Sequence, residues 1–280
     1  MGVGDDAGLV GYDQYESSAA LRPFVRRFLH GYNRDDRPHR LTIPPSGGMF
    51  LSYVDGAPLR VHFSDRTFIG RPRLFIGGQL RREAPELESE VRFGLIGTEF
   101  TPTGFHCLFG VDVDPFTDEI TDLQDLWPDE TIALAAALAA QPDVPARVAL
   151  LDRTLRDRLD GVTSVPLVEA AVERIQVERG LIRVESLAEA LGVHPRTLHR
   201  QFLHAVGVGP KHFAKIVQIN AVVAGLQGFD HSSLDIFALE CGYYDQAHFI
   251  RDFRRFIGAT PMRFLRDDEA FLRAYLGGCD

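Results

Sequence analysis

The sequence predicts an α+β multidomain protein, in which a β-rich N-terminal part precedes an all-α C-terminal part. Short apolar segments separated by Gly- and Pro-rich turns fill roughly the first 120 residues, a pattern typical of a small barrel or sandwich. Beyond Asp118 the composition becomes that of helices, and residues 165–266 contain an internal repeat. The chain has 280 residues, enough for about two domains.

The strand signals of the N-terminal part lie between turn residues such as those of Pro44–Gly48. Leu59, Val61 and Phe63 alternate with polar residues, which is the period of a half-buried strand. The segment Ala20–Tyr32 fits either a short helix or an edge strand. Further candidate strands are Arg73–Ile76, Val91–Ile96 and Phe105–Val113.

Helical signals follow, over a connector that we place at residues 119–164. Asp129–Ala140 is rich in Ala and Leu, which favours a helix. An amphipathic helix is predicted next, and its apolar stripe either packs on the chain's own barrel or forms a dimer contact. We expect the domain boundary at Gly161–Pro166. The stripe consists of Val148, Leu151, Leu155, Leu159 and Val162.

Charge and composition limit the classes of partner and compartment. The net charge of −9 is uneven: residues 1–164 carry 17 Arg, no Lys and 25 acidic side chains, whereas residues 165–266 carry 12 basic and 10 acidic ones. A weakly basic module does not identify DNA by charge alone. No apolar run approaches the ~20 residues that a membrane span needs, and the acidic N-terminus does not resemble a signal peptide. We therefore expect a cytoplasmic protein without a membrane partner.

The internal repeat pairs residues of the same type at two closely related offsets. Two pairs differ by 50 in number and five differ by 51, because one extra residue lies in the turn of the second copy. Such regular pairing indicates two copies of one supersecondary unit. The pairs are Ala188/Ala238, Gly192/Gly242, Leu198/Phe249, Phe202/Phe253, Gly207/Gly258, Pro210/Pro261 and Phe213/Phe264.

Each copy has the pattern of a helix-turn-helix motif. A first helix carries a small residue where its partner crosses closely, and Gly192 or Gly242 ends it because a helix C-terminus often needs a positive φ. A second helix follows, with its apolar residues four positions apart. Pro210 suits the first turn of a long helix that joins the two units and runs to about Gln227.

The exposed face of each second helix is the candidate DNA-reading surface, because arginine can bond guanine, glutamine can bond adenine and isoleucine can contact the thymine methyl group. A solvated polar face is the alternative for a single helix, and the doubling of the motif favours DNA. Arg254 lies one turn beyond Ile250, where we expect a backbone contact. The candidate residues are Arg196, His199 and Arg200 in the first unit and Gln246, Ile250, Arg251 and Arg254 in the second.

These residues resemble the AraC/XylS family of bacterial transcription regulators over roughly Pro166–Arg266. The most specific stretch is Ala238–Pro261, ALECGYYDQAHFIRDFRRFIGATP. It is similar to the family pattern A-x-x-x-G-[FY]-x-[DS]-x-[SA]-[HYQ]-F-x-R-x-F-[KR]-x-x-x-G-x-T-P. The resemblance implies about seven helices, with two recognition helices in successive major-groove turns. In the long helix that joins the two units, Gln218 stands where many family members have Arg. This departure predicts a missing phosphate contact.

The resemblance also implies the role of the N-terminal part. Tyr12–Tyr32 and Gly97–Phe105 are similar to the sensor half of such regulators, which is commonly a cupin-like barrel that binds a small molecule or mediates dimerisation. For the whole protein, the resemblance implies four partners: double-stranded DNA, RNA polymerase, a small-molecule effector and a second copy of the chain. We expect a sensor domain over 1–118, a connector over 119–164, a double helix-turn-helix domain over 165–268 and a tail over 269–280.

An enzyme is the alternative function, namely a cupin-type metal-dependent enzyme with a helical appendage. That alternative requires a cluster of metal ligands. His62 and His106 are the barrel histidines that we place on strands, and their spacing is not that of a metal cupin. Cys107, Cys241 and Cys279 have no metal-site spacing either. We therefore expect no metal, no cofactor and no catalytic residue. A further alternative is an architectural protein that does not read sequence.

Overall fold

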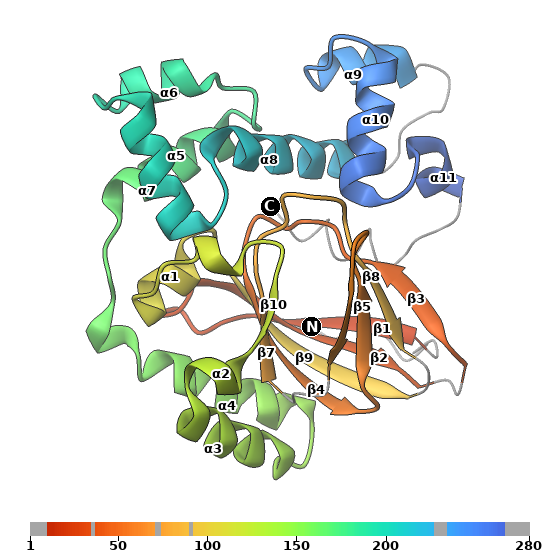
Figure 1. The fold of residues 1–280 in the computed structure, drawn as a ribbon, viewed down its shortest axis with the longest axis vertical. Coiled ribbons are helices and arrows are strands. Elements are labelled where there is room, and N and C mark those ends of the chain that lie inside the picture. The colour runs from red at the N-terminus through yellow and green to blue at the C-terminus, as the bar shows by residue number, and fades with distance from the viewer. Residues whose placement is uncertain (1–9, 35–36, 71–73, 90–91, 227–233, 267–280) are drawn as a thin grey trace.

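The computed structural model contains a β-rich N-terminal part followed by helices, which confirms the predicted α+β class. Figure 1 shows the strands below and the C-terminal helices above them. The predicted tail, together with Cys279, lies outside the described residues. The structure describes residues 10–34, 37–70, 74–89, 92–226 and 234–266.

Two antiparallel sheets form the N-terminal part. One has six strands in the order β1-β2-β9-β4-β7-β10, and the other has four in the order β3-β8-β5-β6. The alternation seen at Leu59 and Val61 corresponds to β5. The strands are β1 (Val10–Tyr15), β2 (Val25–Asn33), β3 (His39–Thr42), β4 (Phe50–Gly56), β5 (Leu59–His62), β6 (Thr67–Gly70), β7 (Leu74–Gly77), β8 (Glu86–Ser89), β9 (Phe93–Phe100) and β10 (Ile120–Asp122).

The six-stranded sheet buries both of its faces, and β4 shows how. Leu51 and Tyr53 belong to the core shared with the connector helices. Their neighbours Phe50 and Ser52 line a cavity on the other side of the sheet. Successive side chains of a strand point to opposite faces. Strand β4 therefore contributes to the packed core on one face of the sheet and to the cavity on the other.

Two predictions for the N-terminal part need correction. Ala20–Tyr32 contains neither a helix nor an edge strand: β2 pairs with both β1 and β9 and is therefore an interior strand. Phe105–Val113 is not a strand, because Gly104–Phe109 forms the helix α1, which ends at Gly110 with φ of 65°. Its residues Phe105 and Leu108 are buried, and so short an apolar run does not distinguish helix from strand by its periodicity.

The predicted connector helices are present. The amphipathic stripe packs within the chain, since Val148, Leu151 and Leu155 are buried against the six-stranded sheet and its neighbouring helices. Of the two alternatives, the structure therefore uses this stripe for intramolecular packing. Leu159 lies beyond the helix, in a 3-10 turn at Leu159–Gly161. The connector helices are α2 (Leu123–Leu126), α3 (Pro128–Ala139) and α4 (Val144–Arg156).

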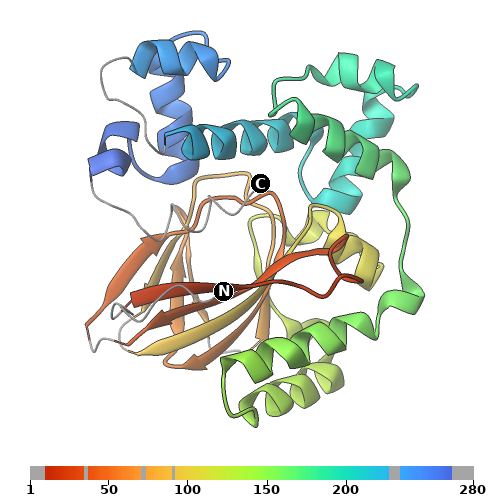
Figure 2. The same ribbon diagram turned by 180° about the vertical axis from the view of Figure 1, so that it is seen from behind.

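The C-terminal part has two helical units joined by α8, as Figures 1 and 2 show from opposite sides. The first unit has its core around Leu198 and Phe202, and the second has a separate core around Phe249 and Phe253. None of the helices in the described ranges is both long and apolar enough to cross a membrane. The helices are α5 (Pro166–Val177), α6 (Val184–Ala190), α7 (Pro195–Val206), α8 (Pro210–Gly225), α9 (Leu234–Glu240), α10 (Gln246–Ile257) and α11 (Pro261–Arg266).

The domain limits remain our proposal. Strand β10 follows residue 118 and pairs with β7, so we propose that the β-rich domain extends to about residue 122. Residue 165 immediately precedes α5, in agreement with the proposed start of the C-terminal domain.

Candidate nucleic-acid interface and ligand cavity

The first unit is built as its sequence pattern indicates. Ala188 is fully buried, and Gly192 has a φ of 66° in the turn that follows α6. The second helix, α7, is capped by His194, whose Nδ1 accepts a hydrogen bond from the backbone N–H of Arg196 at 3.1 Å. Leu198 lies on the buried face of α7, and the opposite face of the helix is exposed.

The second unit repeats this geometry with different capping chemistry. Gly242 has a φ of 79°, and Gly258 has a φ of 81° after α10. The carboxylate of Asp245 accepts a hydrogen bond from the backbone N–H of His248 at 2.7 Å, which caps the start of α10. Phe249 and Phe253 are fully buried.

The candidate reading residues lie mostly where they were predicted. In the first unit Arg196, His199 and Arg200 are exposed on α7. The ring of His199 nevertheless lies against Gly209, since a Cβ atom added at that glycine would be 2.6 Å from the ring carbon Cε1. The imidazole therefore has less freedom than the two guanidinium groups, so we retain His199 as the more constrained of the three candidates.

On α10 the exposed candidates are Gln246, Arg251 and Arg254, whereas Ile250 is half-buried and packs against the core of its unit. Ile250 is therefore partly a core residue. The assignment of all seven residues to DNA contacts stays a prediction.

A groove between α7, α8 and α10 contains basic residues that the sequence analysis did not select. Arg183 and Lys211 are exposed on its walls. Another basic wall residue, Lys215, is paired with Asp252 at 2.9 Å. Lys211 and Lys215 lie four residues apart on α8, and Arg183 immediately precedes α6, so the groove brings together two separate segments. Only an excess of basic residues over 165–266 hinted at them.

Gln218, which stands where many family members have Arg, is a buried residue of α8. Its side chain is buried, donates a hydrogen bond to the carbonyl oxygen of Cys241 at 2.7 Å and accepts one from Lys215 at 2.8 Å. Gln218 therefore joins α8 to the end of α9. With these partners Gln218 makes internal contacts, and the missing phosphate contact stays a prediction.

A cavity of about 140 Å³ lies between the two sheets. Its walls are mainly apolar, with Leu29, Phe50 and Phe75 among them, and Glu119 is the one charged residue that lines it within the described part of the chain. Such a space suits a small apolar molecule. The sequence did not reveal this cavity, because its walls come from strands that are far apart in number.

Histidines and cysteines of the described segments do not gather into a group of three or more potential metal ligands. His62 lies on β5 and contacts Thr67 and Glu88. His106 lies on α1 rather than on a strand, because the segment that we predicted to be extended is helical. Burial raises the pKa of the Cys107 thiol to about 11, so this thiol remains protonated at neutral pH.

Comparison with known proteins finds a matching family model for each part of the chain. Residues 187–267 match a family model described as a helix-turn-helix domain, and residues 13–122 match a domain of unknown function, DUF6597. The HTH-type transcriptional activator RhaS of Salmonella paratyphi B is 30% identical over 89 residues, which are 32% of this chain and 32% of RhaS. The chain thus spans about a third of the length of the curated relatives that it matches.

Comparison with solved structures also found matches. The C-terminal domain of AraT, a response regulator from Geobacillus stearothermophilus, has 25% identity and a TM-score of 0.35, over 37% of this chain and 86% of that one. ToxT from Vibrio cholerae with a bound unsaturated fatty acid has 10% identity and a TM-score of 0.45, over 89% of this chain and 96% of that one.

The resemblance to the AraC/XylS family is carried by the C-terminal domain. The stretch Ala238–Pro261 forms the end of α9, a turn with positive φ at Gly242, α10 and the start of α11. The helix-turn-helix model covers this stretch and most of the first unit. Residues 187–267 thus form a helix-turn-helix domain whose motif is similar to that of the AraC/XylS family of transcription regulators.

Proposed function

We propose that this protein is a sequence-specific DNA-binding transcription regulator that reads double-stranded DNA with α7 and α10. The observation that carries the proposal is the duplicated motif with an exposed basic face on each second helix. Arg196 and Arg200 are exposed in the first unit, and Gln246 and Arg251 are exposed in the second. Helices in successive major grooves contact sites roughly 34 Å apart, so we expect both faces on one side of the domain.

We propose that the cavity between the sheets takes a small apolar effector. Its apolar walls support this ligand class, and its volume of about 140 Å³ suits a molecule of a few non-hydrogen atoms. Effector binding changes DNA affinity only if the effector binds two conformations with different affinity. The protein is then cytoplasmic, and RNA polymerase is a partner at the promoter.

A homodimer remains part of this proposal, with a constraint on its interface. The apolar stripe of α4 is buried within the chain, so a dimer would use a different surface. No specific observation favours the metal-dependent enzyme. An architectural role without sequence readout is a rival, and the following experiment separates it from the proposal.

Selection of bound duplexes from random DNA tests the proposal with the full-length protein. We expect enrichment of a bipartite site whose two boxes are centred about 10 base pairs apart, since each box occupies one turn of the major groove. Footprinting of the selected site should protect both boxes on the same face of the duplex. Equal affinity for selected and scrambled DNA would support the architectural rival and contradict the proposal.

A further inference from the structure

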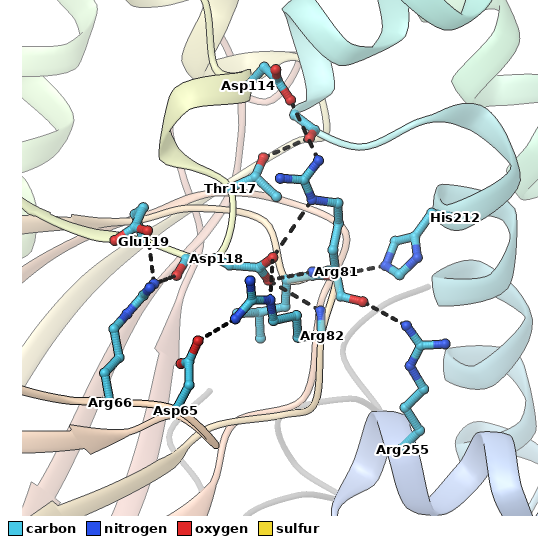
Figure 3. A network of polar contacts seen from close by, with 12 residues as sticks. Asp65, Arg66, Arg81, Arg82, Asp114, Thr117, Asp118, Glu119, His212 and Arg255 are labelled. Carbon is cyan, nitrogen blue, oxygen red and sulfur yellow. Dashed lines mark hydrogen bonds and ion pairs between the residues drawn. The ribbon is translucent and has the colours of Figure 1, made fainter.

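One loop of the β-rich domain borders the ligand cavity and also contacts the DNA-binding domain. Gln79, Leu80 and Pro85 line the cavity. The ring N–H at Nε2 of His212, on α8, donates to the carbonyl oxygen of Leu80 at 2.9 Å. Arg255, on α10, donates to the carbonyl oxygen of Arg81 at 2.9 Å (Figure 3). The loop 79–85 is therefore a shared wall of the cavity and the domain interface.

Asp118 holds this loop in place. One carboxylate oxygen of Asp118 accepts hydrogen bonds from the backbone N–H groups of Arg81 at 2.7 Å and Arg82 at 3.2 Å. Its own N–H donates to the carbonyl oxygen of Gln79 at 2.7 Å. Asp118 is buried and has a φ of 60°, a conformation that residues other than glycine rarely adopt. Figure 3 shows its carboxylate between the two arginines of the loop.

The segment that contains Asp118 also contacts the first helix-turn-helix unit. The Thr117 hydroxyl donates to the carbonyl oxygen of Gly207 at 2.6 Å, and the Val113 N–H donates to the carbonyl oxygen of His204 at 3.0 Å. Both acceptors lie at the C-terminal end of α7. Segment 113–118 thus contacts the first unit, loop 79–85 contacts the second, and Asp118 joins the two.

The two segments have little room to move independently. A Cβ atom at Gly78 would lie 1.7 Å from the carbonyl oxygen of Phe116, so the two backbones are in direct contact there. Apart from the hydroxyl of Thr117, the hydrogen bonds to α7, α8 and α10 described above use backbone atoms of the β-rich domain. A displacement of the loop backbone by an occupant of the cavity would therefore displace the acceptors that hold the helices.

We propose that Asp118 is a positioning residue that couples occupancy of the cavity to the placement of both recognition helices. This inference rests on the proposed function, in that it assigns a regulatory path to the same cavity and the same helices. The proposal depends on geometry: the carboxylate of Asp118 fixes loop 79–85, which lines the cavity and contacts the second unit. The adjoining segment 113–118 contacts the first unit.

The Gly31→Val variant provides a probe that does not require the natural effector. Gly31 lies on β2 and lines the cavity, and a Cβ atom added there meets nothing within 4 Å. Valine suits a strand and fills part of the cavity. Gly31→Ala, with a smaller side chain, is the second variant in case valine prevents folding. Thermal melting establishes that each variant is folded.

The test is a double-mutant cycle between Gly31→Val and Asp118→Gly. Glycine removes the carboxylate and tolerates the positive φ. We expect Gly31→Val to change affinity for the selected DNA by roughly 5- to 150-fold, the usual range of coupling between sites. In the Asp118→Gly background this change should fall below about twofold, and Asp118→Asn, which retains an oxygen acceptor, should restore it. An equal change in all three backgrounds, or none in the wild-type background, overturns the inference.

Hydrogen exchange without DNA gives an independent result. The Ala84 N–H donates to the carbonyl oxygen of Arg255 at 3.4 Å, so its exchange reports the contact between the loop and α10. Gly31→Val should change the exchange rate of Ala84 in the wild-type background and leave it unchanged with Asp118→Gly. If the wild-type protein selects no DNA, the proposed function fails, while this exchange measurement still decides the coupling. If it binds DNA and neither cycle shows coupling, only this inference fails.

Discussion

The two helix-turn-helix units begin their second helices, α7 and α10, with different caps and expose different side chains on them. In the first, Nδ1 of His194 accepts the capping hydrogen bond, whereas in the second the carboxylate of Asp245 does so. A longer turn precedes α10, with Tyr244 88% exposed. Both units nevertheless share glycines with positive φ at the turn before the second helix and at the end of that helix.

The two units also differ in how they contact the β-rich domain. The first is held through backbone carbonyls at the end of α7, at His204 and Gly207. The second is held through the side chain and the carbonyl group of Arg255 on α10. In both, candidate reading residues near the start of the helix are exposed, namely Arg196 and Arg200 on α7 and Gln246 and Arg251 on α10. The contacts with the β-rich domain lie toward the C-terminal end of each helix.

The largest effect should come from removing the equivalent core side chains Phe202 and Phe253. Each is fully buried, in the first and second core respectively. We expect Phe202→Ala and Phe253→Ala each to lower the free energy of unfolding by about 3–5 kcal/mol, measured by denaturant titration. Leu239→Ala is the control, since this side chain is 59% exposed. A loss below about 1 kcal/mol for either phenylalanine would mean that the two cores are not equivalent.

The second comparison is between Arg200 and Arg254, which are both exposed. Arg200→Ala should lower affinity for the selected DNA by about 10- to 100-fold and affect scrambled DNA less, because a bidentate contact to guanine discriminates by roughly 1–3 kcal/mol. Arg254→Ala should weaken binding to both DNAs alike and reduce the salt slope by about one unit. Binding titrations at several salt concentrations measure both quantities. Equal losses on both DNAs for Arg200→Ala would make it a phosphate contact.

The caps should differ by a smaller amount. Asp245→Ala removes a carboxylate acceptor at the start of α10 and should lower the free energy of unfolding by about 1 kcal/mol. His194→Ala should cost less, because its capping hydrogen bond is longer, at 3.1 Å against 2.7 Å. Asp245→Asn is the control, since asparagine also caps helices. A larger loss for His194→Ala than for Asp245→Ala would reverse this ranking.

The smallest effect concerns the pH dependence of stability that arises from His212, which joins α8 to Leu80 of the β-rich domain. Burial lowers the pKa of His212, and the nearby Arg255 lowers it further. A lowered histidine pKa means that the unfolded chain binds the proton more tightly than the folded protein does. The contribution of His212 to the free energy of unfolding is therefore complete above pH 6.5 and is lost as the pH falls through the folded-state pKa.

His212→Gln retains an N–H donor for Leu80 but does not titrate. Its melting temperature should therefore fall less than that of the wild-type protein between pH 7.5 and 5.5. Parallel declines in the two proteins would show that His212 does not contribute to this pH dependence.

Short-range patterns in the sequence were enough to predict the helices of the C-terminal domain. A glycine with positive φ, such as Gly192 or Gly242, and apolar residues four apart report helix ends and buried faces within a few residues of sequence. The repeat and both second helices were therefore predictable, as was the helix of Asp129–Ala140, which became α3.

Only the tertiary structure decided the remaining features, because they depend on contacts between distant segments. The interior position of β2 follows from its pairing with β9, whose residues lie about 70 positions away. The buried role of Gln218 depends on the carbonyl group of Cys241. The cavity and the Asp118 contacts require strands and loops from both sheets to meet. Side-chain periodicity reports which face of an element is buried, but it does not report which other element covers that face.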